Sequence, residues 1–296
     1  MLNNPMPLAL GAILLWASLA TLGALTRTLP PFFVVGVSLC VGSLLSAHRI
    51  RDWKVPPLTL LTGIYGLFGY HFLLFFAFRQ APALEANLLN YLWPLLIVML
   101  SPLLRPGTRL TRRHIIGGVM GFVGAGLIVT GGKLALSQQY LTGYLLAISA
   151  AMVWSTFSLL LGRLPAFSGS AMGGFCLASG LLSLLCHALF ESPAHPSASQ
   201  WATLALLGLG PMGGAFFLWE RALRLGDPRQ IGSLSYSTPL LSTLLLSASG
   251  QGQLNSLAAV AILLILGGAL LGTLPGAATR KRKPPSFAKN ITKQLQ

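Results

Sequence analysis

Ten separate stretches of this chain are apolar and long enough to cross a lipid bilayer, with little sequence between them. A membrane-spanning helix needs about 20 mostly apolar residues, because the hydrocarbon core is about 30 Å thick and a helix rises about 1.5 Å per residue. In 296 residues, ten such spans leave only short loops and a tail. The sequence therefore predicts an all-α membrane protein with ten transmembrane helices and no room for a soluble catalytic domain. The predicted spans are residues 7–25, 31–48, 57–78, 83–103, 114–131, 140–161, 168–190, 200–220, 229–249 and 255–275.

The composition agrees with a membrane protein. Charged residues make up 8% of the chain, whereas soluble domains carry about 25%. The net charge of +15 would suggest a nucleic-acid partner in a soluble protein, but here the basic residues lie between the apolar stretches and in one tail. We therefore interpret them as topology signals and expect no nucleic-acid partner. Cys40, Cys176 and Cys186 lie inside spans without metal-ligand spacing, so we expect no metal and no cofactor.

The positive-inside rule orients the spans. If the N-terminus is cytoplasmic, 17 of the 20 Lys and Arg residues fall on the cytoplasmic side, and only Arg27, Arg79 and Lys133 fall on the other. This asymmetry favours an even number of spans with both termini in the cytoplasm. The basic cluster at residues 280–283 is either a topology anchor or a contact with anionic lipid.

The two halves of the sequence resemble each other. Residues 91–94 read Tyr-Leu-Trp-Pro, and residues 236–239 read Tyr-Ser-Thr-Pro. The same register aligns Ala77 with Ala222, and the glycine-rich fifth span resembles the tenth. Because five spans per half is an odd number, the second half must start from the opposite side of the membrane. The sequence thus predicts an inverted repeat, the architecture of many alternating-access transporters.

The predicted boundaries follow from this repeat. The N-terminal half covers residues 1–136, the C-terminal half covers residues 137–279, and a basic cytoplasmic tail covers residues 280–296. Glycines in the fifth and tenth spans allow close helix packing, so we expect those two spans to form a scaffold or a dimer surface.

Polar and aromatic side chains near the middle of several spans are candidates for a substrate site, because such groups are costly to expose to lipid. The aromatic members are equally compatible with interhelical packing, and the two asparagines with interhelical hydrogen bonds. His71 is either a transport residue or a hydrogen-bonded core histidine. The candidate substrate-binding residues are Trp16, Tyr70, His71, Asn87, Asn90, Tyr91, Trp93, Trp154, Ser155 and Tyr236.

Three prolines inside spans mark candidate kinks or hinges, because proline removes a backbone hydrogen bond. Pro94 and Pro239 occupy matching repeat positions, and Pro211 lies among glycines in the eighth span. Paired breaks at mid-membrane depth are typical of transporter binding sites.

Acidic residues are scarce, and all five lie near predicted span ends or loops. Proton- and sodium-coupled carriers usually place a carboxylate at mid-depth, so this scarcity argues against obligatory ion coupling. His71 and Glu85 remain the candidate proton carriers. Because phosphate-loop, HExxH and GxSxG motifs are absent, we expect no catalytic residues and no enzyme activity.

Ten spans in two inverted halves resemble the EamA-type exporters of the drug/metabolite transporter superfamily. Residues 81–96, which contain Asn-Tyr-Leu-Trp-Pro, are similar to the fourth helix of the YddG-type bacterial aromatic amino acid exporters. The sequence departs from many EamA halves at residues 104–106, where Leu-Arg-Pro replaces a Glu-Arg pair.

This resemblance implies a multi-pass exporter in the bacterial inner membrane. Its substrates would be amino acids, aromatic and other apolar ones among them, moved by alternating access around a central aromatic cavity. The protein would act without a cofactor, as a monomer or a weak homodimer. Two alternatives remain open, namely a carrier of cationic drugs, sugars or nucleotide sugars, and a channel-like membrane protein.

Overall fold

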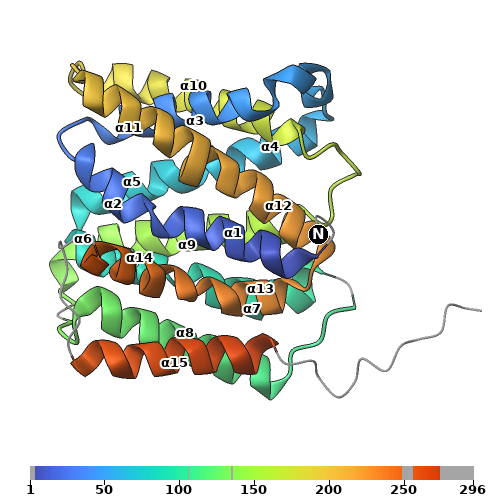
Figure 1. Ribbon diagram of the computed structural model, residues 1–296, viewed down its shortest axis with the longest axis vertical. Helices are drawn as coiled ribbons and strands as arrows, with labels where there is room; N and C mark the ends of the chain where they lie inside the picture. The colour runs from blue at the N-terminus through green and yellow to red at the C-terminus, as the bar shows by residue number, and fades with distance from the viewer. Residues whose placement is uncertain (1–3, 106, 135, 249–255, 274–296) are drawn as a thin grey trace, which may run out of the picture.

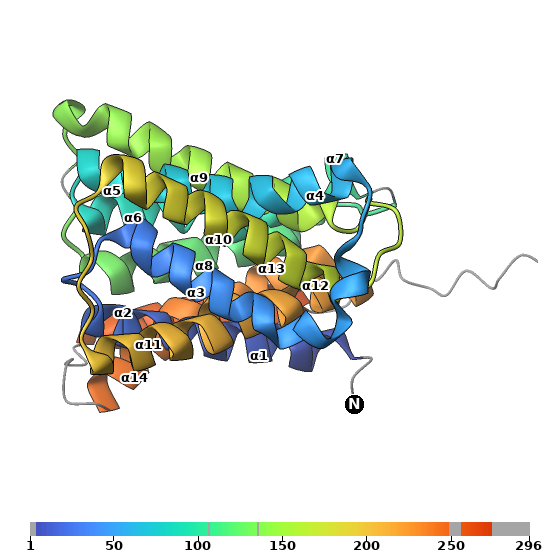
Figure 2. The ribbon, with the colours of Figure 1, turned by 90° about the horizontal axis from the view of Figure 1, so that it is seen from above.

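A computed structural model describes residues 4–105, 107–134, 136–248 and 256–273. Within these residues the chain is helical and has no β-strand, which confirms the predicted all-α class. The helices run roughly along one common direction, and their connections gather at the two ends of the bundle (Figures 1 and 2). The predicted basic tail, residues 280–296, lies outside the described residues.

The helices of the first half are α1 (Pro5–Ala17), α2 (Leu19–Leu25), α3 (Pro31–Ser43), η1 (Leu44–Trp53), α4 (Pro57–Ile64), η2 (Tyr65–Gly69), α5 (Tyr70–Gln80), α6 (Ala83–Asn90), α7 (Trp93–Leu104) and α8 (Arg112–Thr130). Those of the second half are η3 (Gln138–Tyr140), α9 (Leu141–Leu160), α10 (Ala171–Phe190), α11 (Ala198–Leu209), η4 (Gly210–Gly214), α12 (Ala215–Leu225), α13 (Pro228–Ser235), α14 (Ser237–Ala248) and α15 (Ser256–Thr273).

Eight helical stretches in the described residues are long and apolar enough to cross a membrane. They coincide with the first eight predicted spans, and they are Pro5–Leu25, Pro31–Trp53, Pro57–Gln80, Ala83–Leu104, Arg112–Thr130, Gln138–Leu160, Ala171–Phe190 and Ala198–Leu225. The helices α13, α14 and α15 lie where the last two spans are predicted. A multi-pass membrane protein follows from the eight apolar helices.

The eighth stretch runs further than predicted, to Leu225 instead of residue 220. Its last turns hold Glu220 and Arg224, which form an i,i+4 ion pair within α12. Glu220 lies near the end of this stretch, as predicted, but it is buried, with 2% of its surface exposed. Pairing neutralises the two charges and allows the helix to continue.

The internal repeat extends to the interruptions of the helices. A π-helical turn, η2, interrupts the third stretch, and another, η4, interrupts the eighth. The start of η4 at Gly210 lies 145 residues after the start of η2 at Tyr65, and the same offset separates the starts of α13 and α6. Because Tyr91 and Tyr236 share this register too, the two halves break their helices at equivalent positions.

The pairing of equivalent helices also follows the repeat. The helices α3 and α10 pack together at one edge of the bundle, and α8 and α15 pack together at the opposite edge (Figure 1). Between α8 and α15 the contact is glycine on glycine. A Cβ at Gly117 would lie 2.6 Å from the carbonyl oxygen of Gly268, and a Cβ at Gly268 would lie 2.6 Å from that of Gly117. These glycines therefore serve as an internal scaffold.

We expect Gly268→Val to destabilise the protein by about 1–3 kcal/mol, because the new side chain would push α15 away from the backbone of α8. The matched control is Gly267→Val on the same helix, where a Cβ meets only the flexible end of Met120 at 3.2 Å. Thermal unfolding in detergent measures both variants. An equal loss of stability in the two would contradict the proposed packing.

Candidate functional site

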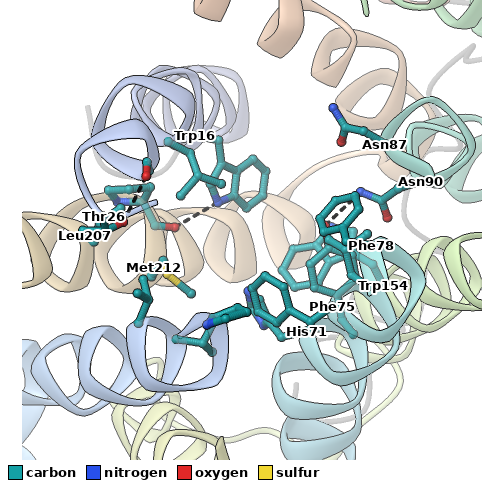
Figure 3. A pocket seen from close by; sticks show the side chains of 18 of the residues that line it. Trp16, Thr26, His71, Phe75, Phe78, Asn87, Asn90, Trp154, Leu207 and Met212 are labelled. Carbon is teal, nitrogen blue, oxygen red and sulfur yellow. Dashed lines mark hydrogen bonds between the residues drawn. The ribbon is translucent and has the colours of Figure 1, made fainter. Parts of the chain in front are cut away.

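A cavity of about 470 Å³ lies at the centre of the bundle, between the two halves. The first half contributes residues of α1, α2, α3, α5, α6 and α7, and the second half contributes residues of α9, α11, η4, α12 and α14. Its walls are mainly aromatic and aliphatic (Figure 3). The cavity therefore combines an apolar interior with a few polar groups, as small-molecule sites do.

Eight of the ten predicted substrate-binding residues line this cavity, although they come from five separate helical segments and the turn after α6. A predicted hinge, Pro211, lines it too. The eight residues are Trp16, Tyr70, His71, Asn87, Asn90, Tyr91, Trp93 and Trp154.

Three indole rings meet at the inner end of the cavity. The ring centroid of Trp16 lies 6.0 Å from that of Trp93 and 5.8 Å from that of Trp154, both in edge-to-face arrangements. Trp219 packs beneath them, 5.0 Å from Trp16, and is 1% exposed. Its indole N–H donates to the Ser158 hydroxyl at 3.0 Å. Edge-to-face contacts of this kind hold rings in defined orientations, so the end of the cavity is a fixed aromatic surface.

The wall of α5 presents a stripe of rings at helical spacing. His71 and Phe75 are four residues apart, Phe78 follows three residues later, and all three line the cavity. The Nδ1 atom of His71 lies 2.6 Å from the Leu67 carbonyl oxygen. Because a carbonyl oxygen only accepts, Nδ1 carries the proton, and Nε2 is an acceptor in the neutral ring.

The helix break between α6 and α7 brings polar groups to the same wall. The α6 helix ends at Asn90 and α7 begins at Trp93. The Asn90 amide donates to the Tyr70 hydroxyl at 3.1 Å (Figure 3). Pro94 has no N–H to offer the Asn90 carbonyl four residues earlier, which accounts for the break. The structure thus places Pro94 at the start of α7.

Two of the predicted residues lie in the walls behind the cavity. Ser155 is fully buried, and its one hydroxyl hydrogen is shared between the Trp93 carbonyl at 2.9 Å and the Ala151 carbonyl at 2.6 Å. Tyr236 is fully buried as well, and its hydroxyl accepts the Leu95 N–H at 3.0 Å. Both side chains therefore hold the backbone at the α6–α7 break. Pro239 follows the equivalent break at Tyr236, between α13 and α14.

The turn η4 is held across the two halves. The indole N–H of Trp16 donates to the carbonyl of Pro211 at 3.1 Å (Figure 3). Met212 and Phe216, just beyond Pro211, also line the cavity. Sequence analysis missed Met212 and Phe216, although their position after the Gly-Pro interruption marked this segment.

Other lining residues were also missed by sequence analysis. Thr26 and Arg27 lie near the end of α2 at the cavity mouth, and Thr238 lies in the first turn of α14. The sequence showed Thr238 as a polar residue near mid-span that aligns with Trp93 in the repeat, but it was not chosen as a candidate. Nothing in the sequence distinguished Arg27 from the basic residues that orient the spans in the membrane.

The end of the bundle opposite the mouth is closed by contacts between the halves. Arg105, which follows α7, donates to the Leu223 carbonyl of α12, and its guanidinium packs against Gly162, where a Cβ would displace it. Leu223 is fully buried. Nearby, within the second half, Arg224 donates to the Phe167 carbonyl at 2.7 Å. The cavity is therefore open at the α2 end and sealed at the α12 end.

The second candidate proton carrier, Glu85, is not among the cavity-lining residues. It accepts a hydrogen bond from the Tyr144 hydroxyl of α9. His71 is 8% exposed and does line the cavity. In the described part of the chain, no group of three or more His, Cys, Asp or Glu residues is arranged to hold a metal ion.

Comparison with known proteins agrees with this architecture. The chain is 40% identical over 272 residues to the aromatic amino acid exporter YddG of Ancylobacter novellus, an alignment that covers 89% of this chain and 94% of that protein. It is 28% identical over 162 residues to an uncharacterized transporter of Acidianus ambivalens, covering 54% of this chain and 61% of that one.

A solved crystal structure superimposes with a TM-score of 0.86 at 38% sequence identity, covering 91% of this chain and 96% of the other. The model of the EamA-like transporter family matches twice, at residues 4–130 and 141–274. The chain therefore belongs to the EamA-like transporter family.

Proposed function

We propose that this protein exports amino acids, aromatic and other apolar ones among them, by alternating access around the central cavity. The observation that carries the proposal is an aromatic cavity between two repeat halves, open at one end and sealed at the other. The similarity to a protein named as an aromatic amino acid exporter supports the substrate class. As a member of a transporter family, the protein would move its substrate without transforming it.

The walls of the cavity suit an aromatic amino acid better than the alternative solutes. The indoles of Trp16, Trp93 and Trp154 offer ring edges and faces for an aromatic side chain. No Asp or Glu lines the cavity in the described part of the chain, so a cationic drug would find no negatively charged partner there. A sugar would need many more hydrogen-bonding groups than this wall presents.

Alternating access requires the seal at the α12 end to open while the mouth closes. The paired breaks at Tyr91 and Tyr236 and the paired turns η2 and η4 lie at equivalent positions in the two halves. Such matched interruptions support hinge roles for Pro94, Pro211 and Pro239. In the described form the cavity is open at the α2 end only. If the two halves exchanged their conformations, the cavity would close there and open at the α12 end instead.

The proposed topology has ten crossings in the bacterial inner membrane, with both termini in the cytoplasm. The N-terminal half would cover residues 1–136 and the C-terminal half residues 137–279, and the protein would act as a monomer or a weak homodimer. The cavity mouth lies on the side of Arg27 and Arg79, so the described conformation would face outward. His71 is the stronger candidate for a proton carrier because it lines the cavity.

Tyr91→Ala and Trp93→Ala should each lower phenylalanine transport about tenfold, because each removes an aromatic contact with the substrate. Counterflow into proteoliposomes measures the rate, with a panel of amino acids, sugars and organic cations, and with and without a proton gradient. Trp201→Ala is the matched control, since Trp201 is 48% exposed on α11 and lies outside the cavity.

Unchanged transport in the Tyr91 and Trp93 variants would refute the proposed site, and flux that never saturates would indicate a channel. Preference for a sugar or an organic cation over every amino acid would refute the substrate class. Thermal unfolding of each variant separates lost transport from lost folding.

Arg105→Ala should weaken the seal at the α12 end, because it removes the contact with the Leu223 carbonyl. The variant should populate the inward-open form more than the unaltered protein does. A cysteine introduced for Phe216, in an otherwise cysteine-free protein, reports this form by its labelling rate from the inner side. Arg109→Ala is the matched control on the same side, because its side chain makes no contact in the proposed seal. Equal labelling rates in the two variants would contradict the role of Arg105.

A further inference from the structure

The polarity of the cavity changes along its depth. Its inner end is formed by rings, with the centroids of Trp93 and Trp154 6.5 Å apart and that of Phe216 5.6 Å from Trp154. These side chains present carbon surfaces and one kind of polar group, the indole N–H. In Trp16 that N–H is already bonded to the Pro211 carbonyl. The inner end therefore favours the apolar part of a ligand.

The mouth has a different character. Arg27 is exposed there, and it is the one Lys, Arg, Asp or Glu among the lining residues in the described part of the chain. The helix α2 lies between it and Trp16, and its seven residues rise about 10 Å. An aromatic amino acid and an extended arginine side chain together can bridge such a depth. The cavity thus has an aromatic inner end and a cationic mouth.

The difference between the two ends of the cavity affects the carboxylate and the ammonium group of an amino acid differently. A carboxylate directed toward the mouth meets a guanidinium, whose planar donors match its geometry. An ammonium group meets only neutral acceptors, such as His71 Nε2 and the amide of Asn90, and ring faces. The cavity therefore has a charged partner for the carboxylate and none for the ammonium group.

Building on the proposed function, we propose that the site recognises aromatic carboxylates, with the ring among the indoles and the carboxylate toward Arg27. The α-ammonium group is dispensable for binding. The protein then binds arylpropionates and aromatic 2-oxo acids as well as amino acids, and it binds aromatic amines more weakly. Arg27 is the specificity-determining residue for this choice.

Competition against labelled phenylalanine, with the full-length protein in lipid nanodiscs, tests this inference. The competitors are 3-phenylpropionate, which lacks the ammonium group, and phenethylamine, which lacks the carboxylate. We expect 3-phenylpropionate to bind within about threefold of phenylalanine and phenethylamine to bind about fivefold more weakly, since an exposed ion pair contributes up to about this factor.

Arg27→Gln should weaken phenylalanine and 3-phenylpropionate by about the same fivefold and leave phenethylamine unchanged. Arg27 is exposed, so the variant should unfold at the same temperature as the unaltered protein. Lys133→Gln is the matched control, because it removes one exposed positive charge on the same side of the membrane, outside the cavity. It should leave all three affinities unchanged.

Three results would overturn the inference: phenethylamine competing as well as 3-phenylpropionate, Arg27→Gln weakening all three ligands equally, or Lys133→Gln reproducing the loss. The proposed function is tested separately, by phenylalanine transport in the unaltered protein. If phenylalanine is neither bound nor transported, that function fails and this inference with it. If phenylalanine is transported without dependence on Arg27, only this inference fails.

Discussion

Inside a bilayer every backbone polar group needs a partner within the protein, and this chain interrupts its helices at mid-depth in both halves. At these interruptions, side chains from other segments bond to the backbone. These bonds join Trp16 to the Pro211 carbonyl, Tyr236 to the Leu95 N–H, and Ser155 to the Trp93 carbonyl. The same bonds shape the cavity wall, so the breaks that open space for a solute also fix its lining.

The few charges of the protein serve mainly to connect segments. Glu191 accepts the N–H groups of Phe32 and Phe33 at the start of α3 and pairs with Arg79 at 3.2 Å. Asp52 accepts from Ser168 at 2.8 Å, which links the first half to the second at the other end. The exposed contact between Asp52 and Ser168 can break and re-form at modest cost, whereas the buried Glu191 carboxylate and the glycine contact between α8 and α15 resist disruption. The helix pair at this edge of the bundle is therefore held rigidly, whereas an exposed contact at the end of the bundle can break and re-form.

Much of the fold could be predicted from sequence, because span length and hydropathy are direct consequences of bilayer thickness. The repeat register found from Tyr91 and Tyr236 also anticipated where the helices break. The structure places eight of the candidate binding residues around one cavity, and their roles in binding stay a prediction. Ser155 and Tyr236 were candidates for substrate binding but lie behind the cavity wall, because a position at mid-depth does not reveal which face of a helix meets the cavity. Arg27 was missed because a charge near a span end satisfies the topology rule equally well.

The central claim is that the two ends of the cavity open in alternation. Paired spin labels on a cysteine-free protein measure it, one pair at Leu84 and Leu189 near the mouth and the other at Leu103 and Leu225 near the seal; all four side chains are exposed. With phenylalanine added, we predict a second population in which the first distance shortens and the second lengthens. Distances that stay fixed, or that lengthen together at both ends, would contradict alternating access.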